Sequence, residues 1–475
     1  MILYNSLGQT KQEFVPHTPG KVNMYTCGPT VYHYAHIGNL RTYIMEDVLE
    51  KYLRFSGYDV NRVMNITDVG HLSSDADTGE DKMLSGAKRE HKTVMEIAKF
   101  YTDAFFADCE KLNIKRPDVV EPATNCIDDF INMISVLLEK GYAYIAGGNV
   151  YFDTSKLDNY YVFGNMNEDD LAVGVRDSVE EDENKRNKAD FVLWFTKSKF
   201  DSQELKWDSP WGVGYPGWHI ECSAMARNYL GDTIDIHCGG QDLQFPHHEN
   251  EIAQSECANG CTFARYWMHN GFINVDNQKM SKSLHNFFTV RDVANVYGYE
   301  PIRYFMLTAG YRMPLNYTVD LIESCKNSLE RLYTCRENLD FTLSKGNFGT
   351  DESLKEKAAE AKQKFCTAMD DDLNTPDALA AVFDLVKDIN TLSATSSKEA
   401  LETAAAAFDE ITGVLGLLYN RKKDEVPAEV TALVEKRAAA KKAKDWATAD
   451  AIRAELTAMG WAVKDTAQGP QLSKL

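Results

Sequence analysis

Residues 21–57, KVNMYTCGPTVYHYAHIGNLRTYIMEDVLEKYLRFSG, place a short apolar run, a Gly-Pro turn and an amphipathic helix pattern in immediate succession. The apolar run is typical of a buried strand, and the residues after the turn have the apolar period of a helix that ends near Gly57. A second apolar run, VNRVMNITDVGH, follows at once. Because strands that alternate with helices favour a parallel sheet, the sequence predicts α/β architecture.

The same pattern returns later in the chain, after a stretch of different character. TIDIHCGG and YWMHNGFINV are typical of further strands, whereas the preceding aromatic and irregular stretch, with the charged loop EEDENKRNK at 180–188, indicates an insertion. Helical periodicity then dominates, and the break RKKDEVP precedes a tail with one basic helix expected over 429–460. The predicted segments are the first half of the sheet domain at 1–116, an insertion at 117–217, the second half of the sheet domain at 218–320, a helical bundle at 321–420 and a small C-terminal domain at 421–475.

Composition narrows the class of protein. The 475 residues include 51 Lys+Arg and 71 Asp+Glu, and the formal net charge of -20 argues against a protein that coats nucleic acid with a uniformly basic surface. A local basic patch stays compatible with this charge. No apolar run reaches the roughly 18 residues that a membrane span needs, so no membrane partner is expected. The N-terminus lacks a signal-peptide layout, and the ten cysteines lack the dense spacing of a disulfide scaffold. We therefore expect a cytoplasmic protein, and a monomer.

His36-Ile37-Gly38-Asn39 stands where the first loop opens the predicted helix. A helix N-terminus offers free N–H groups and a positive dipole end, which suit phosphate. Gly38 allows close approach of a ligand to the backbone, and His36 and Asn39 can donate hydrogen bonds to phosphate oxygens. Taken alone, the tetrapeptide is more often an ordinary helix cap.

Lys279-Met280-Ser281-Lys282-Ser283 follows the strand-like GFINVDN. Two lysines on a loop can neutralise a polyphosphate that gains charge during transfer, although most such loops are merely solvated. Together, HIGN and KMSKS resemble the two signatures of class I aminoacyl-tRNA synthetases. The resemblance implies a Rossmann-like catalytic domain in which both signatures grip ATP, bound with Mg²⁺, and stabilise the transition state for formation of an amino-acid adenylate.

A second set of residues suggests a metal. His247 and Glu251 are four residues apart, hence on one helix face, and Cys27 and Cys222 could complete a tetrahedral site of the kind zinc accepts. Spacing alone leaves His248 as an equal alternative to His247, and a solvated polar helix is the plainer interpretation. HExxH is absent, and the Cys-x3-Cys pair at 257–261 has no second ligand pair downstream, so these segments favour no other metal site.

Over nearly the whole chain the sequence resembles the cysteinyl-tRNA synthetase family, through YTCGPTVY with HIGN, WDSPWGVGYPGWHIECSAM, FPHHENEIAQSE, KMSKS and the tail DAIRAELTAMG. The resemblance implies the following roles. The zinc ligands would be Cys27, Cys222, His247 and Glu251; the cysteine pocket would include Gly28, Thr67 and Trp218; the ATP site would include His36, Gly38, Asn39, Asp242 and Lys282; and the catalytic residues would be His36, Asn39, Lys279 and Lys282.

The implied reaction is the ATP-dependent attachment of cysteine to tRNA(Cys) through a cysteinyl-adenylate. One Zn²⁺ per chain would select the substrate thiol over the hydroxyl of serine, so no editing domain is expected. Two alternatives remain at this point. One is a cysteine ligase that joins cysteine to an amino sugar and lacks a tail like residues 421–475; the other is a non-catalytic zinc protein that binds nucleic acid.

Three positions depart from the family pattern. Asn39 stands where a second histidine is usual, His285 stands where glycine is usual, and Cys238 also replaces a glycine, near the expected pocket. Asparagine keeps a hydrogen-bond donor but cannot carry charge.

The tail helix carries a basic run followed by an aromatic residue. We expect this face to contact tRNA, with aromatic stacking on unpaired bases, although such a run is usually a solvated helix face. The residues concerned are Lys436, Arg437, Lys441, Lys442, Lys444 and Trp446.

Overall fold

The computed structural model describes residues 1–70, 82–164, 182–197, 204–280, 286–421, 427–466 and 469–474. The chain divides into two compact units. The first contains Met1–Asn327, Phe365–Leu379 and Val414–Leu417, and the second contains Ser328–Lys364, Ala380–Gly413 and Leu418–Leu475. Within the described residues, every helix is too short or too polar to cross a bilayer. All ten cysteines are free thiols.

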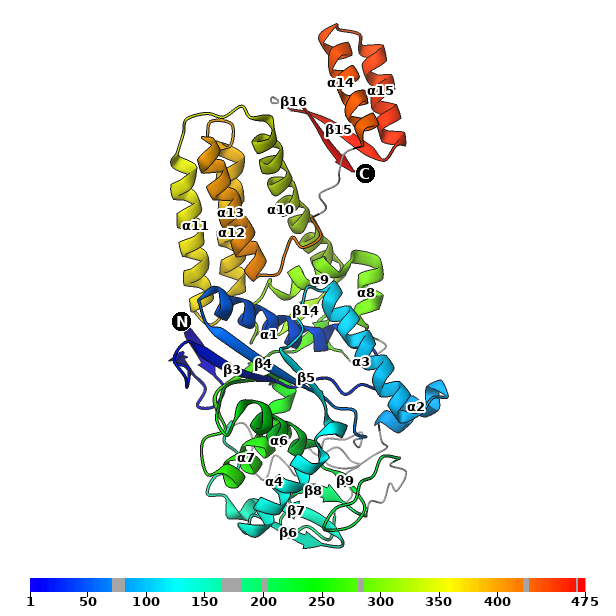
Figure 1. Cartoon of the computed structure of the whole chain (residues 1–475), viewed down its shortest axis with the longest axis vertical. Coiled ribbons are helices and arrows are strands. Elements are labelled where there is room, and N and C mark those ends of the chain that lie inside the picture. The colour runs from blue at the N-terminus through cyan, green and yellow to red at the C-terminus, as the bar shows by residue number, and fades with distance from the viewer. Residues whose placement is uncertain are drawn as a thin grey trace. The chain divides into compact units, whose positions relative to one another are not determined.

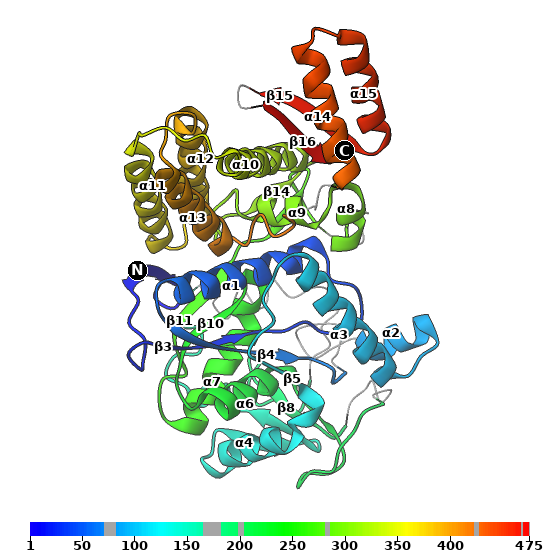
Figure 2. The ribbon, with the colours of Figure 1, turned by 45° about the horizontal axis from the view of Figure 1, so that its top comes forward.

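A five-stranded parallel sheet lies at the centre of the first unit, with the strand order β11-β10-β3-β4-β5 (Figures 1 and 2). The strands β3, β4 and β10 are buried along most of their length, as expected for a parallel sheet covered on both faces. The predicted α/β class is therefore confirmed. The strands are β3 (Lys21–Thr26), β4 (Asp59–Ile66), β5 (Val119–Pro122), β10 (Ile234–Gly240) and β11 (Ala264–Asn270).

Helices cover both faces of this sheet (Figure 2). Helix α1 (Ile37–Phe55) lies on one face, whereas α4 (Ile127–Glu139), α6 (Trp218–Leu230) and α7 (Glu249–Asn259) lie on the other. The chain thus leaves β3 toward one face and the neighbouring β10 toward the opposite face. In open parallel sheets such a reversal creates a crevice at the carboxyl ends of the two strands, and ligands bind there.

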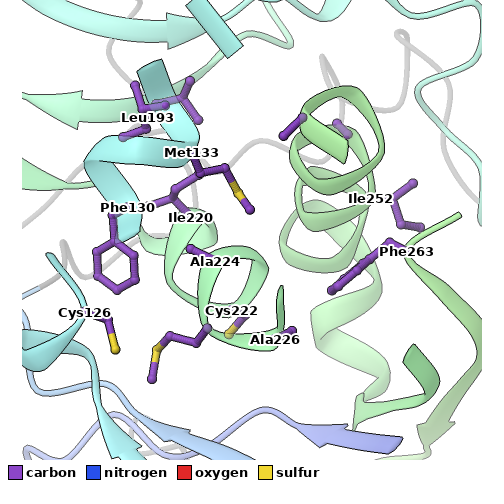
Figure 3. Close-up of a cluster of buried hydrophobic side chains, with 14 of the residues drawn as sticks. Cys126, Phe130, Met133, Leu193, Ile220, Cys222, Ala224, Ala226, Ile252 and Phe263 are labelled. Atoms are coloured by element: carbon purple, nitrogen blue, oxygen red, sulfur yellow. The ribbon is translucent and has the colours of Figure 1, made fainter. Parts of the chain in front are cut away.

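The core beneath the sheet joins α4, α6 and α7 (Figure 3). Phe130 and Met133 of α4 face Ile220 and Ala224 of α6, and all four side chains are almost fully buried. Cys222 lies on the same stretch of α6. This packing fixes the helix that carries one of the predicted metal ligands.

A smaller antiparallel sheet follows α4, with the order β6-β7-β8-β9. Its strands are β6 (Ala143–Ala146), β7 (Asn149–Phe152), β8 (Phe191–Phe195) and β9 (Tyr215–Pro216). β5 pairs with β4, although it falls within the range predicted for the insertion, so the parallel sheet reaches Pro122.

The remaining elements of the first unit flank the sheet. Helix α3 packs beside α1 through the rings of Tyr43 and Phe105, whose centroids are 4.8 Å apart. A hairpin pairs β1 with β2, and a three-stranded sheet has the order β13-β12-β14. These elements are β1 (Ile2–Asn5), β2 (Thr10–Glu13), α2 (Lys82–Glu90), α3 (Val94–Lys111), β12 (Ile273–Val275), β13 (Gln278–Lys279), α8 (Val290–Tyr297), α9 (Tyr299–Met306) and β14 (Leu315–Tyr317).

A buried ion pair ties α1 to α9. The guanidinium of Arg303 lies 2.6 Å from the carboxylate of Asp47, and both side chains are fully buried. Arg303 also donates hydrogen bonds to the carbonyl oxygens of Leu112, Asn113 and Leu415. Lys51 forms a second ion pair with Asp47, whose pKa is lowered because these cations outweigh the effect of its burial.

The predicted helical region consists of α10 (Val319–Lys345), α11 (Ser353–Asp370), α12 (Thr375–Leu392) and α13 (Lys398–Val414). Within the second unit, α10 and α13 are joined by Arg336, which donates two hydrogen bonds to the carboxylate of Asp409. Buried leucines along α10, including Leu332 and Leu339, show the apolar face that the periodicity predicted.

The tail differs from its prediction. In place of one basic helix, the chain forms α14 (Ala428–Lys442) and α15 (Trp446–Ala458), followed by a hairpin of β15 (Trp461–Thr466) and β16 (Gly469–Lys474). Lys444 adopts a left-handed conformation, and Asp445 caps α15 by accepting a hydrogen bond from the backbone of Thr448. A small apolar cluster that includes Val430, Leu456 and Trp461 joins these elements.

Candidate active site

A cavity of about 440 Å³ opens at the carboxyl ends of β3 and β10. Seven of the residues predicted for the site line it, whereas four others are buried and are not among its lining residues: Thr67, Cys222, His247 and Glu251. The backbone of Lys279 belongs to β13, while Lys282 and His285 lie outside the described residues. The seven lining residues are Cys27, Gly28, His36, Gly38, Asn39, Trp218 and Asp242.

HIGN forms a reciprocal cap at the start of α1. The ring Nδ1 of His36 accepts a hydrogen bond from the Asn39 backbone, and the Asn39 side-chain oxygen accepts one from the His36 backbone, each 3.2 Å long. This is a capping box with histidine and asparagine in place of its usual residues. Because Nδ1 is an acceptor, the His36 ring proton lies on Nε2, where it can be donated to a ligand.

Because Gly38 has no side chain, the His36 ring can occupy the space beside it. A Cβ atom at this position would lie 2.9 Å from the His36 Nδ1 and 3.0 Å from the Met280 side chain. The glycine therefore keeps the helix entrance open to a ligand.

Backbone hydrogen bonds join the residues that follow KMSKS to HIGN and to the residue before it. Ile37 donates a backbone hydrogen bond to Phe288, and Val290 donates one to Ala35. The ring of Phe287 packs edge-on against the ring of His36, with centroids 5.1 Å apart. HIGN and residues 287–290, which follow KMSKS in the chain, are thus brought to one place in the fold.

The four predicted metal ligands converge in a buried cluster beside this cavity, which only Cys27 of the four lines. Cys27, Cys222, His247 and Glu251 are all buried, and their ligand atoms lie within 4.8 Å of one another. The two Sγ atoms are 3.8 Å apart, and His247 Nε2 is 3.0 Å from a carboxylate oxygen of Glu251. A tetrahedral zinc ion with Zn–S bonds of about 2.3 Å separates two sulfur ligands by about 3.8 Å, so this donor set fits zinc.

A second combination of donors overlaps the first. Cys27, His237, His248 and Glu251 also bring their ligand atoms within 4.8 Å of one another. The ambiguity between His247 and His248 that the spacing left therefore persists in the fold. The first set contains two thiols and the second only one, so the first suits the thiolate preference of zinc better.

Two histidines without a local sequence signal orient the first set. His219 Nδ1 lies 2.9 Å from His247 Nδ1, and His237 Nε2 lies 2.8 Å from the second oxygen of Glu251. Such partners fix the tautomer and orientation of metal ligands. His237 directly precedes Cys238, so the alternation of a strand turns the Cys238 side chain to the other face of the sheet, away from the ligands.

Charge is concentrated in this cluster. Burial opposes ionisation of Glu251, but His237 and His247 lower its pKa to about 2. Burial likewise opposes protonation of His247, yet Glu251 and Cys222 raise its pKa to about 10. The pKa of Cys222 is lowered despite its burial, because Cys27 and His247 form hydrogen bonds with it. The buried charges thus stabilise one another, an arrangement typical of functional sites.

Asn65 connects Gly28 with Thr67, and Thr67 in turn contacts Glu221. Sequence patterns do not single out Asn65 or Glu221. The Asn65 side chain accepts a hydrogen bond from the Gly28 backbone and donates one to the Thr67 hydroxyl, which in turn donates to Glu221. A Cβ atom at Gly28 would lie 1.6 Å from the Asn65 carbonyl oxygen. Only glycine permits this contact of β3 with β4 beside Cys27.

Glu46 of α1 lies near the crevice and is fully buried, and neither of its carboxylate oxygens has a hydrogen-bond partner among the described residues. Burial raises its pKa from 4.5 to about 8, and Arg62 opposes the rise. Between pH 4.5 and 8, folding therefore takes up a proton at the Glu46 carboxyl. The stability that this proton uptake contributes is fully present below pH 4.5 and is lost as the pH rises toward 8.

We expect Glu46→Gln to remove this dependence. Relative to the variant, the native chain is expected to lose stability by up to about 1.4 kcal/mol per pH unit between pH 5 and 8. Urea unfolding of both proteins at pH 5.5 and 7.5 measures the difference. An equal gap between the two proteins at both pH values would contradict a buried, ionising Glu46.

Comparison with known proteins agrees with this geometry. Residues 13–327 match the family model for the class I (C) tRNA synthetase catalytic domain, residues 364–419 match the DALR domain, and residues 423–471 match the cysteinyl-tRNA ligase anticodon binding domain. The chain is 48% identical to a cysteine–tRNA ligase of Caldicellulosiruptor saccharolyticus over 479 residues. It is 47% identical to that of Clostridioides difficile over 484 residues. Both matches cover 100% of each chain.

Solved structures share the fold at low sequence identity. The Mycobacterium tuberculosis methionyl-tRNA synthetase in complex with methionyl-adenylate aligns with a TM-score of 0.57 at 16% identity, over 83% of this chain and 89% of that one. The LeuRS–tRNA–LeuAMS complex of Agrobacterium radiobacter K84 aligns with a TM-score of 0.59 at 12% identity, over 85% of each chain. A sheet of this topology, a catalytic-domain model that matches most of the chain and full-length relatives at nearly half identity together place the chain in the cysteine–tRNA ligase family of class I tRNA synthetases.

Proposed function

We propose that the chain attaches cysteine to tRNA(Cys) in two steps. Cysteine's carboxylate attacks the α-phosphate of ATP, bound with Mg²⁺, to give cysteinyl-adenylate and pyrophosphate; the terminal ribose of the tRNA then accepts the cysteinyl group. One observation carries the proposal above all. Cys27, one thiol of the metal-ligand cluster, lines the same cavity as the capped start of α1, so a thiol and a triphosphate can be held side by side.

The residues of the crevice mainly position reactants and stabilise charge. The N-terminus of α1, with the Nε2–H of His36, faces the phosphates as a donor. Asn39 uses its carbonyl oxygen in the cap, which leaves the amide nitrogen as the donor toward ATP. Lys279 and Lys282 are proposed to neutralise the pyrophosphate as it leaves. Asp242, at the carboxyl end of β10, is proposed to contact the adenosine side.

We propose Zn²⁺ as the ion held by Cys27, Cys222, His247 and Glu251. When bound, it would coordinate the substrate sulfur as a thiolate, which serine cannot supply at neutral pH. The chain contributes the rest of the pocket. The Trp218 ring stacks on the ring of His247 with centroids 4.2 Å apart, while Gly28 and Thr67 are fixed by Asn65. We propose that these residues select cysteine at the binding step.

We propose a monomer in the cytoplasm; the free cysteines suit a reducing compartment. By position in the chain, we propose residues 1–116 and 218–320 as the catalytic domain, 117–217 as its insertion, 321–420 as the helical bundle and 421–475 as the anticodon-binding domain.

The tail supports tRNA as the acceptor. Lys436, Lys442 and Lys444 are exposed, and the Trp446 side chain is 58% exposed at the start of α15. Arg437 is not part of this surface, because it is buried and forms a two-bond ion pair with Asp465 of β15. The expected basic face is therefore smaller than the run of basic residues suggests.

Replacing Trp446 with alanine is expected to weaken the use of tRNA without affecting adenylate formation. Loss of one base-stacking contact is worth about 1–3 kcal/mol, so KM for tRNA should rise by about fivefold to a hundredfold. Aminoacylation kinetics measure this change, and cysteine-dependent ATP–pyrophosphate exchange is the internal control. Lys464→Ala, an exposed cation on the hairpin, provides a matched comparison within the same domain. Unchanged aminoacylation by the Trp446 variant would remove this residue from the tRNA surface.

Charging of purified tRNA with cysteine tests the whole proposal. We expect transfer of radiolabelled cysteine, but not serine, to the tRNA 3′ end. Normal adenylate formation with no transfer to tRNA would instead favour a ligase that uses another acceptor, such as an amino sugar. Absence of cysteine-dependent pyrophosphate exchange would exclude both activities.

A further inference from the structure

Arg41 is a buried cation that the reaction outlined above does not use. It lies on α1, two residues after Asn39, and its side chain is 2% exposed. Burial lowers its pKa to about 10, so it stays protonated at neutral pH. Among the described residues, its guanidinium donates hydrogen bonds to backbone carbonyl oxygens and to no carboxylate.

These carbonyl oxygens come from two loops that are distant in sequence. One amino group of Arg41 donates to Gly271 at 2.9 Å and to Phe272 at 2.7 Å. The other donates to the carbonyl oxygens of Gly310, Tyr311 and Met313. The four hydrogens of these two amino groups thus serve five acceptors, so one hydrogen is shared, whereas the compact ammonium of lysine has only three donors on one atom.

The first of these loops forms a wall of the crevice. Gly271 and Phe272 connect β11 to β12, and both line the cavity together with Asn270 and Ile273. The second loop supports the first, because Gly271 donates a backbone hydrogen bond to Tyr311. Space at this junction is tight, since a Cβ atom at Gly271 would lie 2.7 Å from the Arg312 carbonyl oxygen.

We infer that Arg41 is a positioning residue for ATP, which holds the crevice wall at Asn270–Ile273 at a fixed distance from the capped start of α1. The inference rests on the proposed function, because it assumes that the nucleotide lies between HIGN and this wall. Arg41 touches neither reacting atoms nor the metal cluster. Its effect should therefore fall on ATP and leave cysteine binding unaltered.

Arg303 provides a matched control. It is equally buried, it also bonds three backbone carbonyls, and neither it nor those partners line the crevice. Arg303→Lys should therefore reproduce the structural cost of Arg41→Lys without displacing the wall. The comparison separates positioning of the nucleotide from general loss of stability.

The test measures KM for ATP and for cysteine in pyrophosphate exchange, ATP affinity by equilibrium dialysis, and the thermal midpoint, all on the full chain. Arg41→Lys is expected to raise both KM and Kd for ATP about tenfold, because small displacements of binding groups have large effects, while KM for cysteine stays within about twofold. Arg303→Lys is expected to lower the midpoint and leave ATP binding of the folded protein unchanged.

Gly271→Ala is the second, independent variant, and it decides the matter if Arg41→Lys fails to fold. The added methyl group displaces the same wall while Arg41 is intact. Gly271→Ala should therefore also weaken ATP binding and leave KM for cysteine unchanged. The inference is overturned if Arg41→Lys, or Gly271→Ala in its place, leaves ATP affinity unchanged. It is equally overturned if the Arg41 and Arg303 variants change both substrates alike. A native chain that binds ATP but lacks cysteine-dependent exchange would refute the proposed function and leave the dialysis comparison valid; a native chain that binds no ATP would refute both.

Discussion

Replacing Cys222 with alanine is expected to empty the metal cluster and to abolish activation of cysteine. The variant removes one of two sulfurs that lie 3.8 Å apart, and the remaining Cys27, His247 and Glu251 supply a single thiolate, which should hold zinc far less tightly. Because the substrate sulfur depends on that ion, cysteine-dependent ATP–pyrophosphate exchange should fall by about a thousandfold or more, equivalent to about 4 kcal/mol. Metal analysis of the purified proteins and exchange rates measure the two effects separately.

His248→Gln is the control, because His248 belongs only to the alternative donor set. We expect this variant to retain zinc, since Cys27, Cys222, His247 and Glu251 are all left in place. Zinc retained by the Cys222 variant but lost by the His248 variant would assign the ion to the alternative set. Undiminished exchange in a zinc-free Cys222 variant would refute the role of the metal in cysteine recognition.

Arg303→Met is expected to produce the largest loss of stability. It leaves the buried Asp47 carboxylate with Lys51 as its one remaining ion-pair partner among the described residues, beside the backbone N–H of Lys115. It also leaves three backbone carbonyl oxygens without their donor. Breaking a buried ion pair from one side typically costs about 3–5 kcal/mol, because the remaining charge is uncompensated. Urea unfolding at pH 7 gives this difference as a change in the free energy of unfolding.

The double variant Asp47→Asn/Arg303→Met tests the cause. Removal of the incompletely compensated Asp47 charge should recover part of the loss, so the double variant should be more stable than Arg303→Met alone. A single-variant loss below about 1 kcal/mol, the value typical of exposed pairs, would show that the pair contributes little. An additive double variant would show that the two side chains do not interact.

The strand–turn–helix at residues 21–57 could be predicted because its signals are local. Buried apolar residues define β3, and a hydrogen-bonding residue stands at each end of the HIGN cap. The convergence of Cys27 with Cys222 could not be predicted from spacing, because the two residues belong to elements that are far apart in the sequence. Only the family resemblance implies it. Asn65, His219, His237 and Glu221 carry no pattern of their own, because each acts through a tertiary contact.

The tail shows how a regular composition can hide a break. The run of alanine and lysine predicts one long helix. Asp445 instead caps a second helix, α15, because its side chain accepts a hydrogen bond from the Thr448 backbone. That signal was present in the sequence and was outweighed by the high helix propensity around it. The burial of Arg437 had no such signal, because its partner Asp465 arrives from the hairpin. β5 was missed for a third reason, since it has only four residues.

Because β3 lies between β4 and β10, its two neighbours in the sheet are synthesised at different times. β3 is among the first segments that the ribosome makes, whereas its neighbour β10 begins only at Ile234. At about 5–20 residues per second, the roughly 200 residues between Thr26 and Ile234 take about 10–40 s to add. For that interval one edge of β3 has no strand beside it, and an open edge can pair with another chain. The nascent protein thus exposes its most interior strand, next to the Cys27 thiol, until the second half of the sheet has been translated.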